Sequence, residues 1–589
     1  MYKQQDKYND TAFALTWELL NNTPDIGEWE LTSDQGTKLN GKGFKSFFES
    51  SDKLSEKINV VFVKNINWFF QIVKRYIETV DNYFVSSVKN GYNIFYMKIN
   101  DNLELRNWDN FWNKVDNAEE FLDNLTKCRD NFKKHDVKNR LSLSSHYKRT
   151  LAAEMWDHMK DQFFLNTTDM RAICKTCSFE EDNLYFFQFS NKAGFYYLNP
   201  KYRNKVVGNV HCYDISSDYI GMMSRKHYPY GSFKKEENIE EIQKIIKNKR
   251  YCWFGVFAFS ELAYRDEESE FFLDLQKYGE TITGEGRSNC WALNLTNVDM
   301  EYFKRICKWD ECSVQDFWYC ECKLLDDDII AMVDYLYRCK NAQPKGSFAK
   351  TIHKFRAELP CGQSIKGVEY NTEVIYDEEN KRFDIVEAED KTYEEIKKTF
   401  DNRGLSPWIG IFTIAYGRLE LYNMMEKIGF NRVVYADTDS VKFIGDEGKK
   451  IIIEHNKEID KEIENVRKKR GVNLHEKMGK WLDEGDVKMF KAINPKWYAT
   501  MDFFGNFDVK AAGADPQAIK KALTQLNWNN PVREFGWRMV VPKMFIRPTV
   551  NKNGTMTLKY ISKFDSVARD EMKVKYTRLY QFKYGEEVK

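Results

Sequence analysis

The stretch Val433-Val434-Tyr435-Ala436-Asp437-Thr438-Asp439-Ser440-Val441 decides the fold of this chain. Apolar and β-branched residues flank the two acids, so the pattern predicts two short strands joined by a tight turn that carries the acids. Such a turn presents Asp437 and Asp439 outward, where carboxylate oxygens can lie about 2.1 Å from a Mg²⁺ ion that also binds substrate phosphates. A bare pair of acids one residue apart is usually a solvated turn, so the rest of the chain has to decide between the two interpretations.

A second acid lies far upstream, in His211-Cys212-Tyr213-Asp214-Ile215-Ser216-Ser217-Asp218-Tyr219. An apolar approach ends at Asp214, which predicts a strand that delivers the acid at its end. By itself Asp214 would be an ordinary strand-end residue. Its pairing with the later acidic turn makes catalysis the better interpretation.

Between the two acidic stretches, residues 347–360 are predicted to form an amphipathic helix. One face carries the apolar residues Phe348, Ile352, Phe355 and Leu359. Lys350 and Lys354 fall together on another face, and Pro360 and Gly362 are expected to end the helix. Paired lysines on such a helix ordinarily face solvent, and only their place between the acids favours phosphate binding.

In order and spacing, these stretches resemble the motifs of family B DNA polymerases of the protein-primed branch, the replicases of small phages and linear plasmids. The resemblance implies that Asp214 and Asp439 bind two Mg²⁺ ions, with Mn²⁺ as the alternative, and that Asp437 supports the site electrostatically. Tyr219 would exclude a ribose 2′-hydroxyl, and Lys354 would bind the triphosphate. The expected nucleotide-binding residues are Tyr219, Lys354, Lys350, Ser217 and Gly362.

The chain departs from the family pattern around the nucleotide. Asp218 and Ile220 replace the Leu and Pro that usually flank the Tyr, and Glu358 and Cys361 replace the Asn and Tyr of the helical motif. These departures alter the nucleotide pocket and the surface that checks the new base pair, but not the expected metal site.

Two further segments resemble DNA-binding motifs of the branch. Lys496-Trp497-Tyr498 resembles the Lys-x-Tyr motif that holds the primer terminus, where a cation pairs with phosphate and a ring packs on sugar or base. Residues 191–195, Asn-Lys-Ala-Gly-Phe, stand where the branch carries a template-contacting Tyr-Arg-Gly-Gly loop. The expected primer and template contacts are Lys496, Tyr498, Lys192, Gly194, Tyr435 and Ser440.

Members of the branch carry an amino-terminal 3′-5′ exonuclease that uses four acids, and here most of those acids are replaced. The vestigial positions are Thr16, Glu18, Phe69 and Thr150, of which only Glu18 is acidic. Neutral side chains cannot offset the dehydration of a divalent cation, so we expect no proofreading. The alternative is that the true ligands are other acids, such as Asp10 or Asp101.

The resemblance implies an α+β protein, in which a right-hand polymerase of palm, fingers and thumb joins an amino-terminal RNase H-like exonuclease-type domain. Two insertions are expected, one near residues 240–335 and one a hairpin at 374–386 with a charged tip. A charged helix is expected within 451–480, and strands near 539–541 and 555–560. The expected domains are a degenerate exonuclease-like domain at 1–175, a linker loop and first palm segment at 176–235, the first insertion with palm at 236–340, fingers at 341–368, the second insertion hairpin at 369–400, palm at 401–500 and thumb at 501–589.

Composition limits the partners and the compartment. The formal charge is only +1, from 90 basic and 89 acidic residues, so nucleic-acid binding requires segregated basic surfaces. The 12 cysteines lack a second Cys-x-x-Cys pair at zinc spacing, and we expect reduced, mostly buried thiols. No basic-then-apolar leader and no apolar run of about 18 residues are found, so we expect no membrane contact and a cytoplasmic monomer, in the bacterial host if phage-encoded.

The leading hypothesis is template-directed DNA synthesis, with DNA template, DNA primer and deoxynucleoside triphosphates as partners and a terminal protein as the expected primer. A second hypothesis is a catalytically altered relative that acts as a nucleic-acid-binding scaffold. A third is a weakly templated nucleotidyl transferase, motivated by the departures at Asp218, Glu358 and Cys361.

Overall fold

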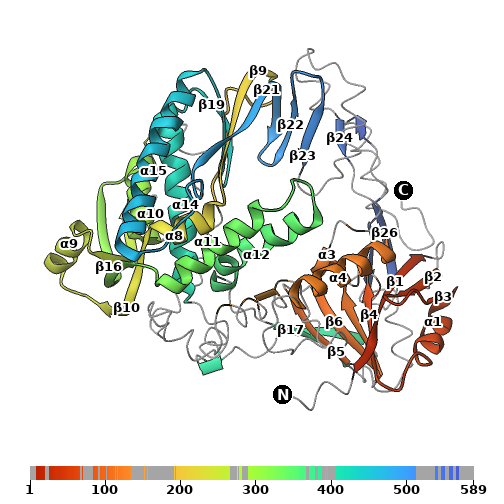
Figure 1. The fold of residues 1–589 in the computed structure, drawn as a ribbon. Coiled ribbons are helices and arrows are strands. Elements are labelled where there is room, and N and C mark those ends of the chain that lie inside the picture. The colour runs from red at the N-terminus through yellow and green to blue at the C-terminus, as the bar shows by residue number, and fades with distance from the viewer. Residues whose placement is uncertain are drawn as a thin grey trace.

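The computed structural model describes residues 8–19, 26–64, 66, 69, 84–89, 93–100, 102–112, 115, 117–133, 152, 155–156, 159, 163, 192, 194–265, 275, 278–281, 290–365, 371–377, 382–387, 392, 394–395, 406–511, 538–540, 545–550, 556–561 and 566–568. Helices and strands are mixed throughout, as expected for an α+β protein. In Figure 1 the amino-terminal strands, in red and orange, gather on one side of the view, and the strands that carry the acids gather on the other.

A seven-stranded sheet, here called the central sheet, carries both acidic stretches. Its strands lie in the order β23, β22, β21, β9, β20, β19 and β8. Their bounds in that order are Phe507–Ala511, Trp497–Met501, Trp481–Asn494, Val207–Ile215, Ser440–Ile444, Val433–Asp437 and Tyr196–Leu198. The predicted strands around the acids are β19 and β20, which pair antiparallel with Asp437 opposite Ser440. β9 pairs with the other edge of β20 and places Asp214 opposite Ser440, so both strand predictions are confirmed.

Three helices, α8 (Asp218–Arg225), α14 (Pro407–Ile428) and α15 (Glu447–Arg470), pack together beside this sheet. α14 begins after Ser406, whose hydroxyl accepts the Trp408 N–H, and Pro407 occupies its first turn, where no backbone donor is lost. α15 begins four residues before the predicted charged segment and covers it as far as Arg470, and it buries Ile452, Ile459, Ile463 and Val466 along one face. The helix is therefore amphipathic and is anchored by that face.

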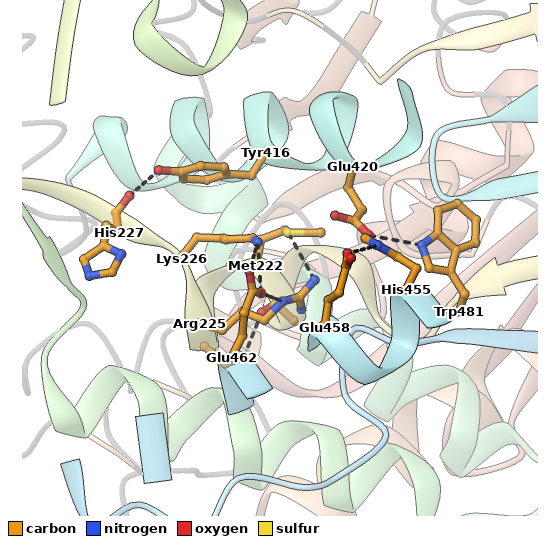
Figure 2. A network of polar contacts seen from close by, with 12 residues as sticks. Met222, Arg225, Lys226, His227, Tyr416, Glu420, His455, Glu458, Glu462 and Trp481 are labelled. Atoms are coloured by element: carbon orange, nitrogen blue, oxygen red, sulfur yellow. Dashed lines mark hydrogen bonds and ion pairs between the residues drawn. The ribbon is translucent and has the colours of Figure 1, made fainter. Parts of the chain in front are cut away.

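Ion pairs and hydrogen bonds tie these helices together, as Figure 2 shows. Arg225 and Lys226, at the end of α8, both donate to the Glu462 carboxylate of α15, at 2.9 and 2.8 Å. Glu420 of α14 lies between the His455 ring, 2.5 Å away, and the Trp481 indole N–H, 3.1 Å away. Charge-assisted hydrogen bonds of this kind fix the three elements relative to one another.

The expected first insertion contains a five-stranded sheet with the order β10, β16, β11, β14 and β13. The bounds are His227–Lys235, Glu311–Leu324, Tyr251–Ser260, Trp291–Thr296 and Gly279–Thr281, with short strands β12 (Ala263–Tyr264) and β15 (Cys307–Lys308) beside it. Helix α9 spans Ile239–Lys247, and α10 spans Asn297–Ile306. α10 begins with a capping box in which Thr296 and Asp299 bond each other's backbone N–H.

Cys252 of β11 and Cys322 of β16 form a disulfide, with Cα atoms 5.0 Å apart. The prediction of reduced thiols is wrong for this pair. The reason is that strand pairing brings together two cysteines separated by 70 residues, which sequence spacing does not reveal.

Helices α11 (Asp327–Asn341) and α12 (Phe348–Ile365) pack against each other, and α12 also packs against α14. The predicted apolar face of α12 is confirmed, since Ile352 and Leu359 are buried and Phe348 and Phe355 pack against the same core. The prediction that Pro360 and Gly362 end the helix is wrong.

Helix α12 continues through Pro360 to Ile365 because its last turn packs closely on α14. A Cβ on Gly410 of α14 would lie 2.1 Å from Ile365 Cγ2 and 2.3 Å from Ser364 Oγ. Gly410 therefore permits an approach whose packing offsets the hydrogen bond lost at proline.

The amino-terminal sheet has nine strands in the order β18, β17, β5, β6, β7, β4, β1, β2 and β3. The bounds are Arg382–Glu387, Asn371–Asp377, Phe84–Lys89, Asn93–Asn100, Leu103–Asn107, Ile58–Val63, Tyr8–Leu19, Ile26–Ser33 and Lys38–Lys42, and helices α1 (Gly43–Ser51), α3 (Asp109–Trp112) and α4 (Ala118–Lys133) accompany it. The predicted hairpin is confirmed as β17 and β18, which pair antiparallel. It adds to the amino-terminal sheet through β5, a connection that the sequence does not indicate.

Near the carboxyl end, β24 (Arg538–Val540) pairs with β27 (Ser566–Ala568), and β25 (Phe545–Val550) pairs with β26 (Met556–Ile561). The strands predicted near 539–541 and 555–560 are confirmed as β24 and β26. Among the helices that the structure describes, none combines the length and the apolar character needed to cross a membrane.

Candidate active site

The turn between β19 and β20 is held in place by the neighbouring strand β8 and by Phe195, which precedes that strand. The Thr438 N–H donates to the Phe195 carbonyl oxygen at 2.7 Å, and Asp437 lies opposite Tyr196 in the sheet. Thr438 has a φ of 57°, a left-handed conformation that a β-branched residue seldom adopts. Strained backbone of this kind persists where surrounding contacts determine it, and it is often found at functional sites.

Asp214 and Asp439 lie side by side at the ends of neighbouring strands. Asp214 is opposite Ser440, and the Ile215 N–H donates to the Asp439 carbonyl oxygen at 2.7 Å. The sheet register therefore places the two acids, which are 225 positions apart in the chain, at one edge of the sheet.

Electrostatics distinguish this acid pair from ordinary surface carboxylates. Burial, followed by the charges of the nearby Asp439 and Glu484, raises the pKa of Asp214 to about 7, although Lys442 and Lys354 oppose this shift. Burial also raises the pKa of Asp439 to about 6, against the lowering influence of Lys354. Two neighbouring acids with raised pKa values favour the binding of a cation, because a positive charge stabilises both ionised carboxylates.

The residues at this edge fit Mg²⁺. Within the described part of the chain, no group of three or more His, Cys, Asp or Glu side chains is arranged to hold a metal ion. Mg²⁺ does not need such a cage, because it is commonly held by one or two carboxylates together with water and substrate phosphates. Asp214 and Asp439 supply that number, and their raised pKa values show that a cation would relieve their repulsion.

Asp437 is engaged by its own neighbours. Its carboxylate accepts hydrogen bonds from the Tyr435 hydroxyl at 3.2 Å and the Thr438 hydroxyl at 3.0 Å, and Lys496 Nζ lies 3.9 Å away. The Ser440 hydroxyl donates to the Asp437 carbonyl oxygen at 3.2 Å. These contacts shape the turn and leave Asp437 less free to bind a metal than Asp439.

Several cations face the acids from α11 and α12. Lys354 is exposed and forms a loose ion pair with Glu358 at 4.0 Å, and its charge lowers the pKa of both Asp214 and Asp439. Lys340 of α11 donates to the Ser217 hydroxyl at 2.7 Å. Burial lowers the pKa of Lys340, and the charge of Lys354 lowers it further, while Glu358 and Asp214 raise it. These side chains form a basic rim opposite the acid pair.

Lys350, by contrast, is tied to its own helix start. Its Nζ donates to the Gln343 carbonyl oxygen at 3.4 Å, and its backbone N–H donates to the Ser347 hydroxyl at 3.1 Å. Gly362 is exposed, and a Cβ there would meet nothing within 4 Å. The surface beside Gly362 is therefore open.

Tyr219 lies in the first turn of α8, close to Asp439 and to Cys361 of α12. Burial raises the pKa of its hydroxyl, and the neighbouring Cys361, Asp218 and Asp439 raise it further. Ser217, at the start of α8, has a φ of 56°, a second strained non-glycine residue beside Asp214. The departure at Asp218 buries a carboxyl group that is 4% exposed and has no hydrogen-bond partner among the described residues.

Tyr435 was expected to contact DNA, and this expectation is wrong. Its side chain is completely buried, because β19 lies inside the central sheet. Its hydroxyl donates to Asp437 and accepts the Lys496 backbone N–H at 2.9 Å. Tyr435 therefore links the acidic turn to the expected primer-binding segment.

Lys496 and Tyr498 lie where that segment turns from β21 into β22. Lys496 is exposed, with a φ of 62°. Tyr498 is half-buried, with its ring centroid 4.9 Å from that of Tyr435 and Lys442 Nζ 5.1 Å from its own centroid. Lys496 is thus free to meet a ligand close to Asp437, while Tyr498 packs on the same aromatic group that supports the turn.

Lys192 was expected to contact the template, and this is also wrong, because its side chain is 3% exposed. Its Nζ donates to the Asn294 carbonyl oxygen and lies 3.5 Å from the Asp299 carboxylate. Burial lowers the pKa of Lys192 to about 8, although Asp299 raises it. Gly194 lies against the acidic turn, since a Cβ there would come 2.9 Å from Thr438 Cγ2.

The two expected exonuclease positions whose side chains are described hold no acid. Thr16 lies on β1 and is half-buried, and its hydroxyl donates to the Glu30 carbonyl oxygen at 3.4 Å. Phe69 is fully buried and packs edge-to-face on Trp17, Phe44 and Phe47, with centroids 5.5–5.8 Å apart. Thr150, Asp101 and the side chains of Glu18 and Asp10 lie outside the described residues.

Sequence reasoning missed two cations at the site, Lys340 and Lys442. Lys442 is 8% exposed, and it lowers the pKa of Asp214 from the strand next to it. Lys442 stands two residues after Ser440 in β20, and side chains two apart on a strand share one face of the sheet, so the sequence could have predicted that Lys442 lies on the face of Ser440. Lys340 lies at the end of a helix with no local motif, and only the tertiary contact with Ser217 reveals it.

Comparisons with known proteins point to one group. No protein-family model matches the sequence. The DNA polymerases of Bacillus phages Nf and B103 are 22% and 24% identical over 333 residues, which is 55% of this chain and 51% of each polymerase. The polymerase of Bacillus phage PZA is 23% identical over 332 residues, 56% of this chain and 52% of its own. The chain thus matches about half the length of these curated relatives.

The fold extends the similarity to the whole chain. The structure of the phi29 DNA polymerase with single-stranded DNA matches with a TM-score of 0.63 at 14% identity, covering 95% of this chain and all of that one. The complex of the same polymerase with primer-template DNA matches with a TM-score of 0.62, at the same identity and coverage. The resemblance to protein-primed family B DNA polymerases is therefore confirmed, and this chain has their fold.

Proposed function

We propose that this protein is a DNA-directed DNA polymerase that transfers nucleotides by a two-metal mechanism. The observation that carries the proposal is the placement of Asp214 beside Asp439, with pKa values raised to about 7 and about 6, at one edge of the central sheet. The similarity to phage polymerases in sequence and fold supports the same conclusion.

Asp214 and Asp439 would hold two Mg²⁺ ions, with Mn²⁺ as an alternative, which supply positive charge to the attacking and leaving oxygens. Lys354 and Lys340 bind the triphosphate as positive charges from α12 and α11, and Ser217 positions Lys340 by accepting its hydrogen bond. Tyr219, in the first turn of α8, forms the floor beneath the sugar and excludes a 2′-hydroxyl. The open surface at Gly362 admits the base of the incoming nucleotide.

Lys496 holds the phosphate next to the primer terminus, because it is exposed and its Nζ lies 3.9 Å from the Asp437 carboxylate. Tyr498 sets the position of this segment through its packing on Tyr435. Asp437 supports the turn and moderates the charge of Lys496. In this arrangement the primer-binding segment and the metal ligands belong to the same sheet, which limits their relative movement.

We assign the domains with the boundaries expected from the sequence, including a palm that holds most of the central sheet, fingers at 341–368 and a thumb at 501–589, which supplies β23 to that sheet. A protein primer and a monomeric state belong to the same proposal. We further propose that the amino-terminal domain does not proofread, because the position of Phe69 lies in an aromatic core that cannot hold a divalent cation.

Primer extension tests the polymerase. A labelled primer on a defined template, with Mg²⁺ and deoxynucleotides, should be extended by the wild type and not by Asp439→Ala. Asp446→Ala is the matched control, because Asp446 follows the same strand pair but its side chain is 86% exposed. Extension that ignores the template sequence, or that survives Asp439→Ala, would contradict the proposal.

Protein priming and proofreading need separate assays. If synthesis without a DNA primer starts only when a candidate terminal protein is added, protein priming is supported. Metal-dependent shortening of a mismatched 3′ end that is lost on Glu18→Ala would overturn the absence of proofreading.

A further inference from the structure

A buried ion cluster connects the first insertion to the acidic turn. Its members are Lys192, Asp299 and Arg418, each 3% exposed or less. They come from three separate parts of the chain: the segment before β8, helix α10 and helix α14. Burying three charged side chains costs free energy, so we ask which part of the structure the cluster holds in place.

Asp299 is the centre of the cluster. Its carboxylate accepts the Arg418 Nη2–H at 2.7 Å and the Tyr302 hydroxyl at 2.6 Å, and it closes the capping box of α10 through Thr296. Burial alone would raise the pKa of Asp299, but Lys192, Arg418 and Tyr302 hold it below its ordinary value. The carboxylate is therefore ionised and fully bonded.

Arg418 connects Asp299 to the segment before β8 through hydrogen bonds. Its Nη1–H donates to the Lys192 carbonyl oxygen at 2.9 Å, while its Nη2–H holds Asp299. Lys192 in turn bonds the Asn294 carbonyl oxygen with its Nζ. Both the backbone and the side chain of Lys192 are thus fixed by the insertion and by α14.

The same segment reaches the acidic turn three residues later. The Phe195 ring packs edge-to-face on Tyr302, with centroids 5.1 Å apart, and its carbonyl oxygen accepts the Thr438 N–H at 2.7 Å. Gly194 lies so close to Thr438 that a Cβ would come within 2.9 Å. Thr438 stands between Asp437 and Asp439 and has the strained φ of 57°. A shift of Gly194 or Phe195 is therefore expected to move the turn.

We propose that Lys192 and Arg418 are positioning residues that set the Asp437–Thr438–Asp439 turn, so that metal binding at Asp439 depends on the insertion that carries Asp299. The proposal rests on the metal-binding role of Asp439 given above. Groups that orient metal ligands without touching the metal typically change metal affinity or activity about 10–100-fold when altered.

Two variants and one matched control test it in the full chain. Arg418→Lys keeps the charge but loses the planar fork that holds Asp299 and the Lys192 carbonyl together. Lys192→Met removes the cation and keeps the stem. Arg106→Lys is the control, because Arg106 is also buried and bonds Glu104 at 2.6 Å, but in the amino-terminal sheet.

The readout is Mn²⁺ affinity, measured by electron paramagnetic resonance with a dideoxy-terminated primer-template and a deoxynucleotide, so that no turnover is needed. Both cluster variants should weaken Mn²⁺ binding about tenfold or more. Their DNA affinity should stay within twofold of wild type, and Arg106→Lys should leave Mn²⁺ affinity unchanged. Unchanged Mn²⁺ affinity in a folded Arg418→Lys would overturn the proposal, as would weakened DNA binding in Lys192→Met.

A second pair of variants tests the last link without disturbing the cluster. Gly194→Ala should weaken Mn²⁺ binding by pushing on Thr438 Cγ2, and Gly194→Ala with Thr438→Ser should recover part of it, because the serine lacks that atom and keeps its hydroxyl. No loss in Gly194→Ala, or no recovery in the double variant, would refute the transmission through Thr438.

Asp439→Ala separates this proposal from the proposed function. Suppose that the wild type binds Mn²⁺, that Asp439→Ala does not, and that the wild type extends no primer. The proposed polymerase activity is then wrong, while the Mn²⁺ affinities of Arg418→Lys and Lys192→Met still decide the positioning proposal. If Asp439→Ala binds Mn²⁺ as wild type does, the metal role of Asp439 and the positioning proposal fall together.

Discussion

Asp218 offers a stringent test of how the site is built, because it buries a carboxyl group where the family usually has Leu. The side chain is 4% exposed, and neither of its oxygens has a hydrogen-bond partner among the described residues. One oxygen lies 2.6 Å from where a Cβ on Gly417 would stand, so the group is pressed against α14. We predict that Asp218→Asn stabilises the protein at neutral pH and does so increasingly as the pH rises.

The sign follows from proton linkage. Burial raises the pKa of Asp218 well above its ordinary value, and the charge of Asp439 raises it further, while Arg225 opposes this. An unfolded Asp ionises near pH ~3.9, so above that pH folding must take up a proton. Over the window between the unfolded and folded pKa values, the free energy of unfolding therefore falls by about 1.4 kcal/mol per pH unit.

Asparagine has nearly the same shape and takes up no proton. Its buried amide costs about 1–3 kcal/mol when unbonded, close to the cost of the neutral carboxyl group that it replaces. Asp218→Asn should thus be near neutral at about pH 4 and gain about 1.4 kcal/mol over wild type for each pH unit above that, until the folded pKa is reached.

The assay is urea-induced unfolding at pH 5, 6 and 7 with a chelator present, followed by tryptophan fluorescence, with Asp310→Asn as the control because Asp310 is exposed. The difference between variant and wild type should widen with pH, and the control should show no such trend. A constant difference would refute the reasoning. A difference that narrows with pH would mean that Asp218 is ionised and paired with Arg225, whose Nη1 also lacks a partner among the described residues.

Three other changes test separate parts of the molecule. His455→Gln leaves Glu420 buried without its cation and should cost about 3–5 kcal/mol. Burial lowers the pKa of His455, but Glu420 outweighs it and the net pKa is raised, so this stabilisation is full below about pH 6.5 and fades as the pH rises through the folded pKa. Melting curves at pH 6 and pH 9 should differ for wild type and agree for the variant, and equal pH dependence would contradict the pairing. Lys340→Met should raise the KM for deoxynucleotides on the order of tenfold, since it removes a charged contact, whereas the exposed Lys345→Met should not; equal KM values would place Lys340 outside the triphosphate site. Phe69→Asp should destabilise the amino-terminal sheet by about 3–5 kcal/mol in urea unfolding, as loss of a buried ring does, and an unchanged unfolding midpoint would show that this position tolerates a metal-ligand side chain.

The sequence was sufficient for the parts of the site that depend on local pattern. The alternation around Asp437 and Asp439 predicts β19 and β20, and the apolar spacing at residues 348–359 predicts most of α12. Period-two and helical patterns report which face of an element is buried, so they place the acids and Lys354 correctly. They do not report which distant residue covers that face.

The errors arise where distant contacts override a local signal. The resemblance of residues 191–195 to a template-contacting loop implies an exposed cation, but Lys192 is buried by Asp299, 107 positions away, and by Arg418, 226 positions away. Helix α12 passes Pro360 because Gly410 of another helix permits close packing. In both cases a residue in a separate element decides the outcome, and a single sequence carries no record of that partnership.

The strained turn needs support from the residues around it, and the buried cluster helps to supply that support. Two acids whose pKa values are raised to about 7 and about 6 repel each other, and a β-branched residue at a φ of 57° costs about 1–3 kcal/mol. Within the turn, the Thr438 and Ser440 hydroxyls support the arrangement through hydrogen bonds to Asp437. Neighbouring segments hold it as well, because the Phe195 carbonyl oxygen accepts the Thr438 N–H and the Tyr435 hydroxyl links Asp437 to the Lys496 backbone N–H. Under the proposed function, the Lys192 segment would therefore act as a buried support for the turn rather than as a DNA contact, since a fixed neighbour can hold the ligands where a metal ion would need them.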